Sequence, residues 1–359
     1  MSRRFRTGLV VGKFAPLHRG HELLVRRALA ECERVVILSY QNPEIPGYPA
    51  AVRERWLAEL FPQAERLVVT GERLRAWAPP ESEFSRIPAN GGPESDDRRF
   101  CGFLCRDVLG TTVDAVFTSE AYGDGFAAEL TRFFRERDPR HPAVEHVCVD
   151  RARLEIPVSG TRLRADVHGL REWLPPAVYA SFVRRICLLG GESTGKTTLA
   201  AALARELGTE MVPEYGRQVW TEQEGRLDFG DMERIGHVQV EMEEAAARRA
   251  DRYLVCDTSP LTTLFFSHHF FGRAAPALER LAEREYDLTV LCAPDFEFVQ
   301  DGIRRGGTFR HHQHEWYLRE LERRAIPHLL VTGTLEERLA RILAALPPCD
   351  VPRSPSDRT

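Results

Sequence analysis

The chain contains 359 residues, which exceeds the length at which a single hydrophobic core usually stops growing, so we expect two domains. Its net charge of -4 gives no global basic field, and this excludes duplex DNA and anionic membranes as default partners. No apolar run approaches the roughly 20 residues that span a bilayer, and the N-terminus reaches a strand too early for a signal peptide, so we expect a cytoplasmic protein.

The first half alternates strand-like apolar runs with amphipathic stretches. We expect strands at 8–11, 34–40, 66–70, 115–119 and 144–149, and helices at 21–32, 50–61, 98–109 and up to Phe134. This alternation predicts a parallel sheet that is covered on both faces. Residues 78–97 are rich in proline, glycine and charge, so we expect a mobile loop or an insertion there and assign it no chemistry.

The first candidate site follows the first strand, in the string GKFAPLHRGH that begins at Gly12. A lone His-x-x-His is usually a pair of exposed histidines, but small residues here let a phosphate approach the backbone at a helix start. Donors placed at that point stabilise the charge that builds when pyrophosphate leaves an α-phosphorus. The candidate ATP-binding residues are Gly12, Phe14, Ala15, His18 and His21, and Lys13, His18 and His21 are candidate catalytic residues.

After a helical connector at 170–182 the α/β pattern restarts. We expect strands at 185–189, near Met211, at 253–257, 288–292 and 327–331, with helices at 197–207, up to Arg252 and at the end. The expected domains are therefore 1–182 and 183–346, and residues 347–359 have the composition of a disordered tail.

The second candidate site is the string GGESTGKT, which matches GxxxxGK(S/T) between an apolar strand and a helix. Backbone amides of such a loop cradle phosphates, Lys196 bridges the β- and γ-phosphates, and Thr197 is a ligand of Mg²⁺. The predicted ATP-binding residues of this P-loop are Gly190, Gly191, Glu192, Ser193, Thr194, Gly195, Lys196, Thr197 and Thr198.

Residues beyond the P-loop indicate a small-molecule kinase. Glu214 follows the next expected strand and is the candidate general base, and with Tyr215, Arg217 and Asp257 it forms the predicted acceptor site. Asp257 ends a strand, where it could hold Mg²⁺ or bind a ribose, and both roles stay open.

The segment 301–310 is glycine-hinged and rich in arginine, so we expect a closing lid whose Arg304 and Arg310 meet the transferred phosphoryl group. A solvated basic loop is the alternative. The nearby histidines His311, His312 and His314 lack helical i,i+4 spacing, and we assign them no metal.

Two motifs of the first half resemble signatures of the nucleotidyltransferase superfamily. The string from His18 to His21 is similar to HxGH, and the string VSGTRLR that begins at Val158 is similar to ISxTxxR, with valine in place of isoleucine. By this resemblance Ser159, Thr161 and Arg164 bind the phosphates of ATP, and Arg164 neutralises charge as a catalytic residue. The resemblance implies a Rossmann-like fold for this half.

Further residues resemble the acceptor side of nicotinamide mononucleotide (NMN) adenylyltransferases. Ser119, Glu120 and Tyr122 follow a strand as in the acceptor loop of those enzymes, and Arg55 with Trp56 is similar to their Arg-Trp pair. These five residues are the predicted NMN site. Core packing for Trp56 and a solvated helix charge for Arg55 stay open as alternatives.

The order of these motifs resembles the bifunctional NadR family over residues 6–346. The resemblance implies a nucleotidyltransferase domain followed by a P-loop kinase domain, which phosphorylates nicotinamide riboside to NMN and adenylylates NMN to NAD. It implies ATP as co-substrate at both sites, Mg²⁺ as cofactor, and ATP, nicotinamide riboside, NMN and NAD as partners.

Some family members carry an N-terminal helix-turn-helix module. This chain begins at the first catalytic strand, so we expect no DNA binding, and a homo-oligomer stays open. Two rival functions remain: the same folds acting on another acceptor, such as a pantetheine or sugar phosphate, and a nucleotide-sensing protein without turnover.

Overall fold

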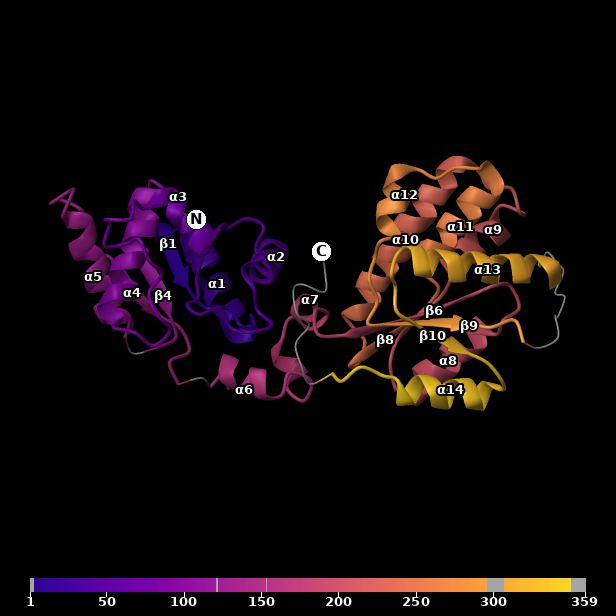
Figure 1. Ribbon diagram of the computed structural model, residues 1–359. Helices are drawn as coiled ribbons and strands as arrows, with labels where there is room; N and C mark the ends of the chain where they lie inside the picture. The colour runs from indigo at the N-terminus through magenta and orange to yellow at the C-terminus, as the bar shows by residue number, and fades with distance from the viewer. Residues whose placement is uncertain (1–2, 121, 153, 296–306, 350–359) are drawn as a thin grey trace. The chain divides into compact units, whose positions relative to one another are not determined.

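The computed structural model describes residues 3–120, 122–152, 154–295 and 307–349, and it divides into two compact units. One unit extends to Tyr179 and the other begins at Ala180. Each unit contains one five-stranded sheet in which all paired strands run parallel (Figure 1). The two parallel α/β units confirm the fold class that the alternating pattern predicts.

The first unit has the strand order β3-β2-β1-β4-β5. Because the order reverses at β1, the chain leaves a crevice at the carboxyl ends of β1 and β4, where ligands bind in open α/β sheets. The elements are β1 (Phe5–Val11), α1 (Arg19–Glu31), β2 (Cys32–Ser39), α2 (Ala50–Leu60), β3 (Glu65–Val68), α3 (Gly71–Trp77), α4 (Glu94–Phe103), the π-helix η1 (Leu104–Val108), β4 (Ala115–Thr118), α5 (Gly123–Arg135), β5 (Glu145–Cys148), α6 (Gly160–Ala165), the 3-10 helix η2 (Arg171–Trp173) and α7 (Pro176–Tyr179).

Residues 78–93 pack onto the first unit, whereas the sequence predicts a mobile loop or an insertion through residue 97, so the packing argues against a mobile loop. The ring of Phe84 stacks on Phe103 with centroids 4.6 Å apart, and Asn90 Nδ2 donates to the carbonyl of Pro43 at 2.7 Å. Helix α4 begins at Glu94, four residues before the predicted start. Because single apolar anchors such as Phe84 have no periodicity, a pattern search does not detect them.

The second unit has the strand order β10-β9-β6-β8-β7. Its elements are β6 (Arg184–Gly190), α8 (Lys196–Glu206), β7 (Met211–Val212), α9 (Tyr215–Glu222), α10 (Phe229–Ala247), β8 (Tyr253–Asp257), α11 (Pro260–Phe271), α12 (Pro276–Leu281), β9 (Leu288–Cys292), α13 (Gly307–Arg323), β10 (His328–Val331) and α14 (Leu335–Ala344). Helices α11, α12 and α13 are absent from the sequence prediction, which places no helix between the strands of that region.

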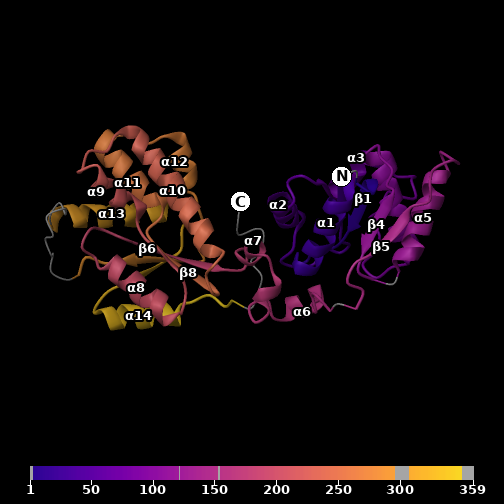
Figure 2. The ribbon, with the colours of Figure 1, turned by 180° about the vertical axis from the view of Figure 1, so that it is seen from behind.

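Both faces of this sheet are covered, because β6 is apolar on both sides. Ile186 and Leu188 pack with α8 and α14, while Cys187 and Leu189 pack with α9 to α13. Seen from behind, α8 and α14 lie on one face and α9 to α12 on the other (Figure 2). This arrangement leaves the carboxyl end of β6 and the loop after it open to a ligand.

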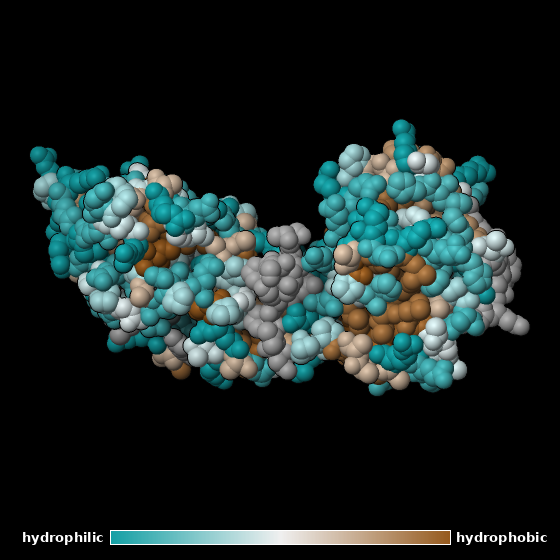
Figure 3. Space-filling view, in the orientation of Figure 1, coloured by the Kyte–Doolittle hydropathy of each residue, from teal (hydrophilic) through white to brown (hydrophobic). Residues whose placement is uncertain are grey.

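The surface carries one visible apolar region on the second unit, between α13 and α14 (Figure 3). β10 is the edge strand there, and Leu330 on it is 38% exposed. Over the described ranges, none of the helices has the length and apolar character that a membrane span requires.

Candidate functional sites

The first cavity lies at the carboxyl ends of β1 and β4 and has a volume of about 520 Å³. Three segments that are far apart in the sequence line it: the loop after β1, the end of β4 and the start of α6. Of the predicted residues, the cavity lining includes Gly12, Lys13, Phe14, Ala15, His18, His21, Ser119, Glu120, Tyr122, Ser159, Thr161 and Arg164.

His18 and His21 form one stacked unit at the start of α1. Their ring centroids lie 3.8 Å apart, and the backbone N–H of His18 donates to Nδ1 of His21 at 3.3 Å. Because Nδ1 of His21 accepts, the proton of a neutral His21 ring resides on Nε2. A helix start also favours anions, so this end of the cavity suits phosphate.

Arg164 is held from two sides. Its Nη1 donates to the carbonyl of Ala15 at 2.6 Å, and its Nη2 donates to Oγ1 of Thr161 at 3.0 Å. Ser159 caps α6 by accepting the backbone N–H of Arg162. The two sequence motifs therefore meet across the cavity, 149 residues apart in the chain.

The other end of the cavity contains Tyr40, Asn90 and Asp97, which the sequence motifs do not identify. Tyr40 Oη donates to Asp97 Oδ1 at 3.0 Å. Burial raises the pKa of Asp97, while the Tyr40 hydrogen bond and the charge of Lys13 oppose the shift. The signal that could have found Asn90 and Asp97 is their place in a polar segment after a strand, where loops often carry ligand-binding residues.

The structure does not bring Arg55 and Trp56 to the described cavity lining. The Trp56 side chain is 1% exposed and packs on Tyr48, so it belongs to the hydrophobic core, which was the alternative to a role in the NMN site. Arg55 is exposed on α2. The buried arginine of α2 is Arg53, whose Nε donates to the carbonyl of Tyr48 at 3.1 Å. Burial lowers the pKa of Arg53, and Glu44 opposes this shift.

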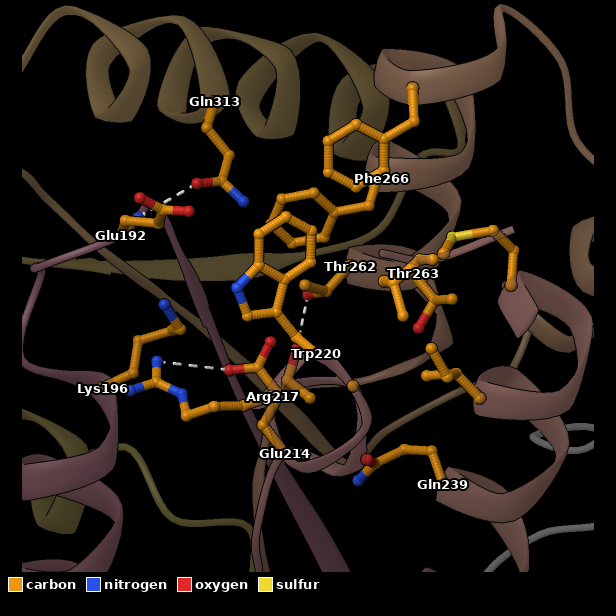
Figure 4. Close-up of a pocket in the computed structure, with 16 residues that line it drawn as sticks. Glu192, Lys196, Glu214, Arg217, Trp220, Gln239, Thr262, Thr263, Phe266 and Gln313 are labelled. Carbon is orange, nitrogen blue, oxygen red and sulfur yellow. Dashed lines mark hydrogen bonds and ion pairs between the residues drawn. The ribbon is translucent and has the colours of Figure 1, made fainter. Parts of the chain in front are cut away.

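The second cavity lies beside the P-loop (Figure 4). β6 ends at Gly190 and α8 starts at Lys196, so the loop lies at a strand-to-helix junction as predicted. Gly190 and Gly195 have φ values of 148° and 76°, which glycine adopts without strain. A Cβ on Gly191 would lie 2.6 Å from the carbonyl of Arg310, so the loop requires glycine at that position.

Lys196 folds back onto its own loop. Its Nζ donates to the carbonyls of Gly190 and Gly191 at 2.8 and 2.9 Å. The Thr194 hydroxyl donates to the carbonyl of Gly191 at 2.8 Å, and Gln313 accepts the backbone N–H of Glu192 at 3.0 Å. The ammonium is thus held at the loop, while Thr197 and Thr198 are exposed at the start of α8.

Glu214 faces this cavity together with Lys196 and Arg217 (Figure 4). Arg217 Nη2 lies 3.5 Å from Glu214 Oε2. Burial raises the pKa of Glu214, and the charges of Lys196 and Arg217 partly offset it. A carboxyl group with a raised pKa in a cleft is a candidate proton acceptor.

Asp257 ends β8 and is 1% exposed. Its Oδ1 is buried without a hydrogen-bond partner among the described residues. The following residue, Thr258, has a φ of 104°, which is rare for a β-branched side chain. Strained backbone of this kind clusters at functional sites, and Thr258 lines the cavity.

An aromatic and apolar wall closes the rest of the second cavity. The rings of Trp220 and Phe270 stack with centroids 5.9 Å apart, and Phe266 stacks on Phe270 at 5.6 Å. Trp220 and Phe266 point into the same space as Glu214 (Figure 4). This wall suits a flat ring.

Of the predicted residues, the described lining of this cavity includes Glu192, Lys196, Glu214 and Arg217, and the other described ones lie outside it. Tyr215 packs with the core on the α9 to α13 side, and its N–H donates to Gln239 at 3.0 Å. Arg310 is buried in α13 with its backbone against Gly191. Arg304 lies outside the described residues, as does most of the predicted lid.

Comparisons with known proteins agree with this geometry. The family model of the AAA domain matches residues 185–338. The trifunctional NAD biosynthesis/regulator protein NadR of Escherichia coli (strain K12) is 28% identical over 322 residues, covering 84% of this chain and 72% of that protein. NadR of Salmonella typhimurium is 27% identical over 353 residues, covering 94% of this chain and 78% of that protein. The chain is thus similar to NadR over most of its length.

Solved structures share the fold of this chain. A crystal structure of NadR protein in complex with NR has a TM-score of 0.63 at 20% identity and covers 96% of both chains. A crystal structure of NadR protein in complex with NAD and AMP-PNP has a TM-score of 0.62 at 20% identity and covers 95% of both chains.

The sequence motifs did not identify the side walls of the two cavities. Trp220, Phe266 and Phe270 come from α9 and α11, and α11 was not predicted. A usable signal was present, because Phe266 and Phe270 are four residues apart and share a helix face. Gln313 approaches the P-loop from 121 residues away, which local spacing does not reveal.

Proposed function

We propose that this protein makes NAD in two steps, using one cavity for each. The second unit transfers the γ-phosphoryl group of ATP to nicotinamide riboside, and the first unit transfers the adenylyl group of ATP to the resulting NMN with release of pyrophosphate. The observation that carries the proposal is that the described residues form two separate cavities, each beside a strand-to-helix junction, in a chain that is similar to NadR over most of its length. The solved NadR complexes, one with NR and one with NAD and AMP-PNP, support the same substrates.

In the first cavity, His18, His21 and Arg164 surround the proposed place of the ATP phosphates. The NMN phosphate attacks the α-phosphorus in line, and pyrophosphate leaves. His21 offers Nε2–H, and Arg164 carries a fixed positive charge near it. Donors that are aimed before the reaction stabilise the charge on the leaving oxygens without reorganisation.

In the second cavity, Glu214 accepts the proton of the riboside hydroxyl as that oxygen attacks the γ-phosphorus of ATP. Lys196 leaves the carbonyls of its own loop and binds the phosphates. The nicotinamide ring carries a positive charge, and the electron-rich faces of Trp220 and Phe266 attract such a ring. The wall therefore selects the riboside by the charge and the flatness of its base.

Thr197 and Asp257 would hold Mg²⁺ in this unit. The buried, unpaired Oδ1 of Asp257, in the described part of the chain, fits a ligand that arrives with the nucleotide. Bound there, Mg²⁺ would neutralise charge on the phosphates of ATP.

The test is product identification from nicotinamide riboside and ATP by chromatography and mass spectrometry. We expect NMN and then NAD from the unmodified chain. The His18→Ala variant should accumulate NMN without NAD, and Lys196→Ala should make NAD only when NMN is supplied. Absence of both products from the unmodified chain would reject the proposal, and turnover of a pantetheine or sugar phosphate would favour another acceptor.

A further inference from the structure

His146 on β5 is absent from the sequence motifs and from the first cavity's described lining, yet it is joined to that lining. Its Nε2 lies 2.9 Å from Oγ1 of Thr118, and its Nδ1 lies 2.8 Å from Oδ1 of Asp124. Thr118 ends β4 and lines the cavity, and Asp124 lies in the first turn of α5. The imidazole is 8% exposed and thus connects three elements around the acceptor side of the cavity.

The contact with Asp124 fixes the direction of one hydrogen bond of the ring. A carboxylate only accepts, so Nδ1 of His146 carries the proton that faces Asp124, and Nε2 of the neutral ring is an acceptor. The Thr118 hydroxyl, 2.9 Å from Nε2, can then donate to it, although the same hydroxyl also lies 3.1 Å from the carbonyl of Glu120 and its single proton serves one of these two acceptors. Its oxygen also accepts the backbone N–H of Glu120 at 3.3 Å, which links the imidazole to a residue of the proposed NMN side.

The chain leaves space for this ring at Gly123, the first residue of α5. A Cβ at Gly123 would lie 2.0 Å from Nε2 of His146, a distance that no side chain tolerates. The imidazole thus lies directly against the helix start. Glycine at this position is required by the close approach of the ring, since Gly123 has no positive φ.

We propose that His146 is a positioning residue for the acceptor nucleotide, which acts through Thr118 on the cavity-lining backbone of Glu120. The inference rests on the proposed adenylyl transfer, in which this side of the cavity receives NMN. Loss of the Nε2 contact should loosen the acceptor side and leave the ATP side, built by His18, His21 and Arg164, unchanged.

A pair of amide substitutions separates the two contacts. In His146→Gln the amide reaches the place of Nε2 and keeps the contact with Thr118, whereas in His146→Asn it reaches only the place of Nδ1 and keeps the contact with Asp124. We expect the KM for NMN to stay within about threefold in the glutamine variant and to rise about tenfold in the asparagine variant, with the KM for ATP unchanged in both.

Thr118→Val supplies the matched test from the other partner. It should raise the KM for NMN at least as much as His146→Asn does, because it also removes the Thr118 contact with Glu120. Adding His146→Asn to Thr118→Val should cause no further rise, because the contact between the two side chains is already lost. Equal effects of the two amides, or parallel changes in the KM for ATP, would show that His146 only fills the space above Gly123 and would overturn the inference.

A measurement without catalysis keeps the inference separate from the proposed function. In protein with ¹⁵N-labelled histidine, the signals that vanish in His146→Gln identify this ring among the 12 histidines. We expect its neutral form to be protonated on Nδ1, and a ring protonated on Nε2 would overturn the inference. If the unmodified chain makes no NAD, the proposed adenylyl transfer fails, while the tautomer still decides whether His146 orients Thr118.

Discussion

Arg53 Nη1 donates a hydrogen bond to the hydroxyl of Ser39 at 2.5 Å, inside the first unit. The Ser39 hydroxyl in turn donates to the carbonyl of Lys13 at 3.4 Å. The Arg53 side chain is fully buried, and Glu44 is its ionic partner at 3.2 Å. The buried guanidinium of Arg53 is thus linked through Ser39 to the loop after β1, which lines the first cavity.

Arg53→Ala should lower the free energy of unfolding of the first unit by about 3 kcal/mol, because it removes a buried, multiply bonded charge and leaves the Ser39 hydroxyl and Glu44 without it. Arg55→Ala, two residues further on the exposed face of α2, should change it by less than about 0.5 kcal/mol. Urea denaturation followed by circular dichroism measures both. If Arg55→Ala instead raised the KM for NMN in a stable protein, the predicted acceptor role of Arg55 would be restored.

His18→Ala should lower kcat for NAD formation by a factor of about 100 to 1000, the usual loss for one preorganised donor. The matched control is His168→Ala, because His168 is equally buried in the same unit but contacts Tyr179 outside the described cavity lining. That variant should lose stability and keep the kcat of its folded fraction. Similar losses of kcat in the two variants would show that His18 has no direct role in adenylyl transfer.

The kinase activity should depend on pH through Glu214. Burial raises the pKa of this carboxyl, and a general base must be ionised, so kcat falls as the pH drops through the raised pKa. Arg217→Ala removes a charge that opposes the shift, so the acid limb of the kcat profile should move to higher pH. Arg226→Ala, an exposed arginine 3.8 Å from Glu224, should leave the limb in place.

Glu214→Gln should lower kcat about 100-fold or more and raise the melting temperature at neutral pH. Between the ordinary pKa of an unfolded glutamate and the raised pKa of the folded state, the folded state binds more protons, so stability falls as the pH rises through that window. Glutamine does not titrate and avoids this cost. Calorimetry measures both melting temperatures. A lower melting temperature for Glu214→Gln than for the unmodified chain at neutral pH would contradict the argument that burying the ionised carboxylate costs stability.

Trp220→Leu should raise the KM for nicotinamide riboside about tenfold, because a cation over an aromatic face gains about 0.5–2 kcal/mol. The uncharged dihydronicotinamide riboside isolates the charge effect, and its KM should change less. Phe229→Leu is the control, since that ring contacts Phe271 and Arg273 and is not part of the described cavity lining. An equal rise for both ribosides would assign Trp220 to shape alone.

The amino-acid sequence by itself determined the alternation of strands and helices, apart from α11, α12 and α13, and it placed the candidate phosphate-binding residues at two strand-to-helix junctions. Motifs such as the one from Gly12 to His21 and the P-loop are local, since one strand end, one loop and one helix start build each of them. Their backbone geometry depends on glycines whose positions the sequence states directly. Periodicity and spacing therefore suffice for these parts.

Only the tertiary structure decided which side chains complete each cavity. Arg53 rather than Arg55 is buried, Trp56 belongs to the core, and Asn90 reaches the first cavity from a segment without periodicity. Gln313 meets Glu192 across 121 residues. The physical reason is that elements distant in the chain pack together to make a cavity wall. The hydrophobic period of one helix indicates which of its faces is apolar, but it does not indicate which neighbouring element that face contacts.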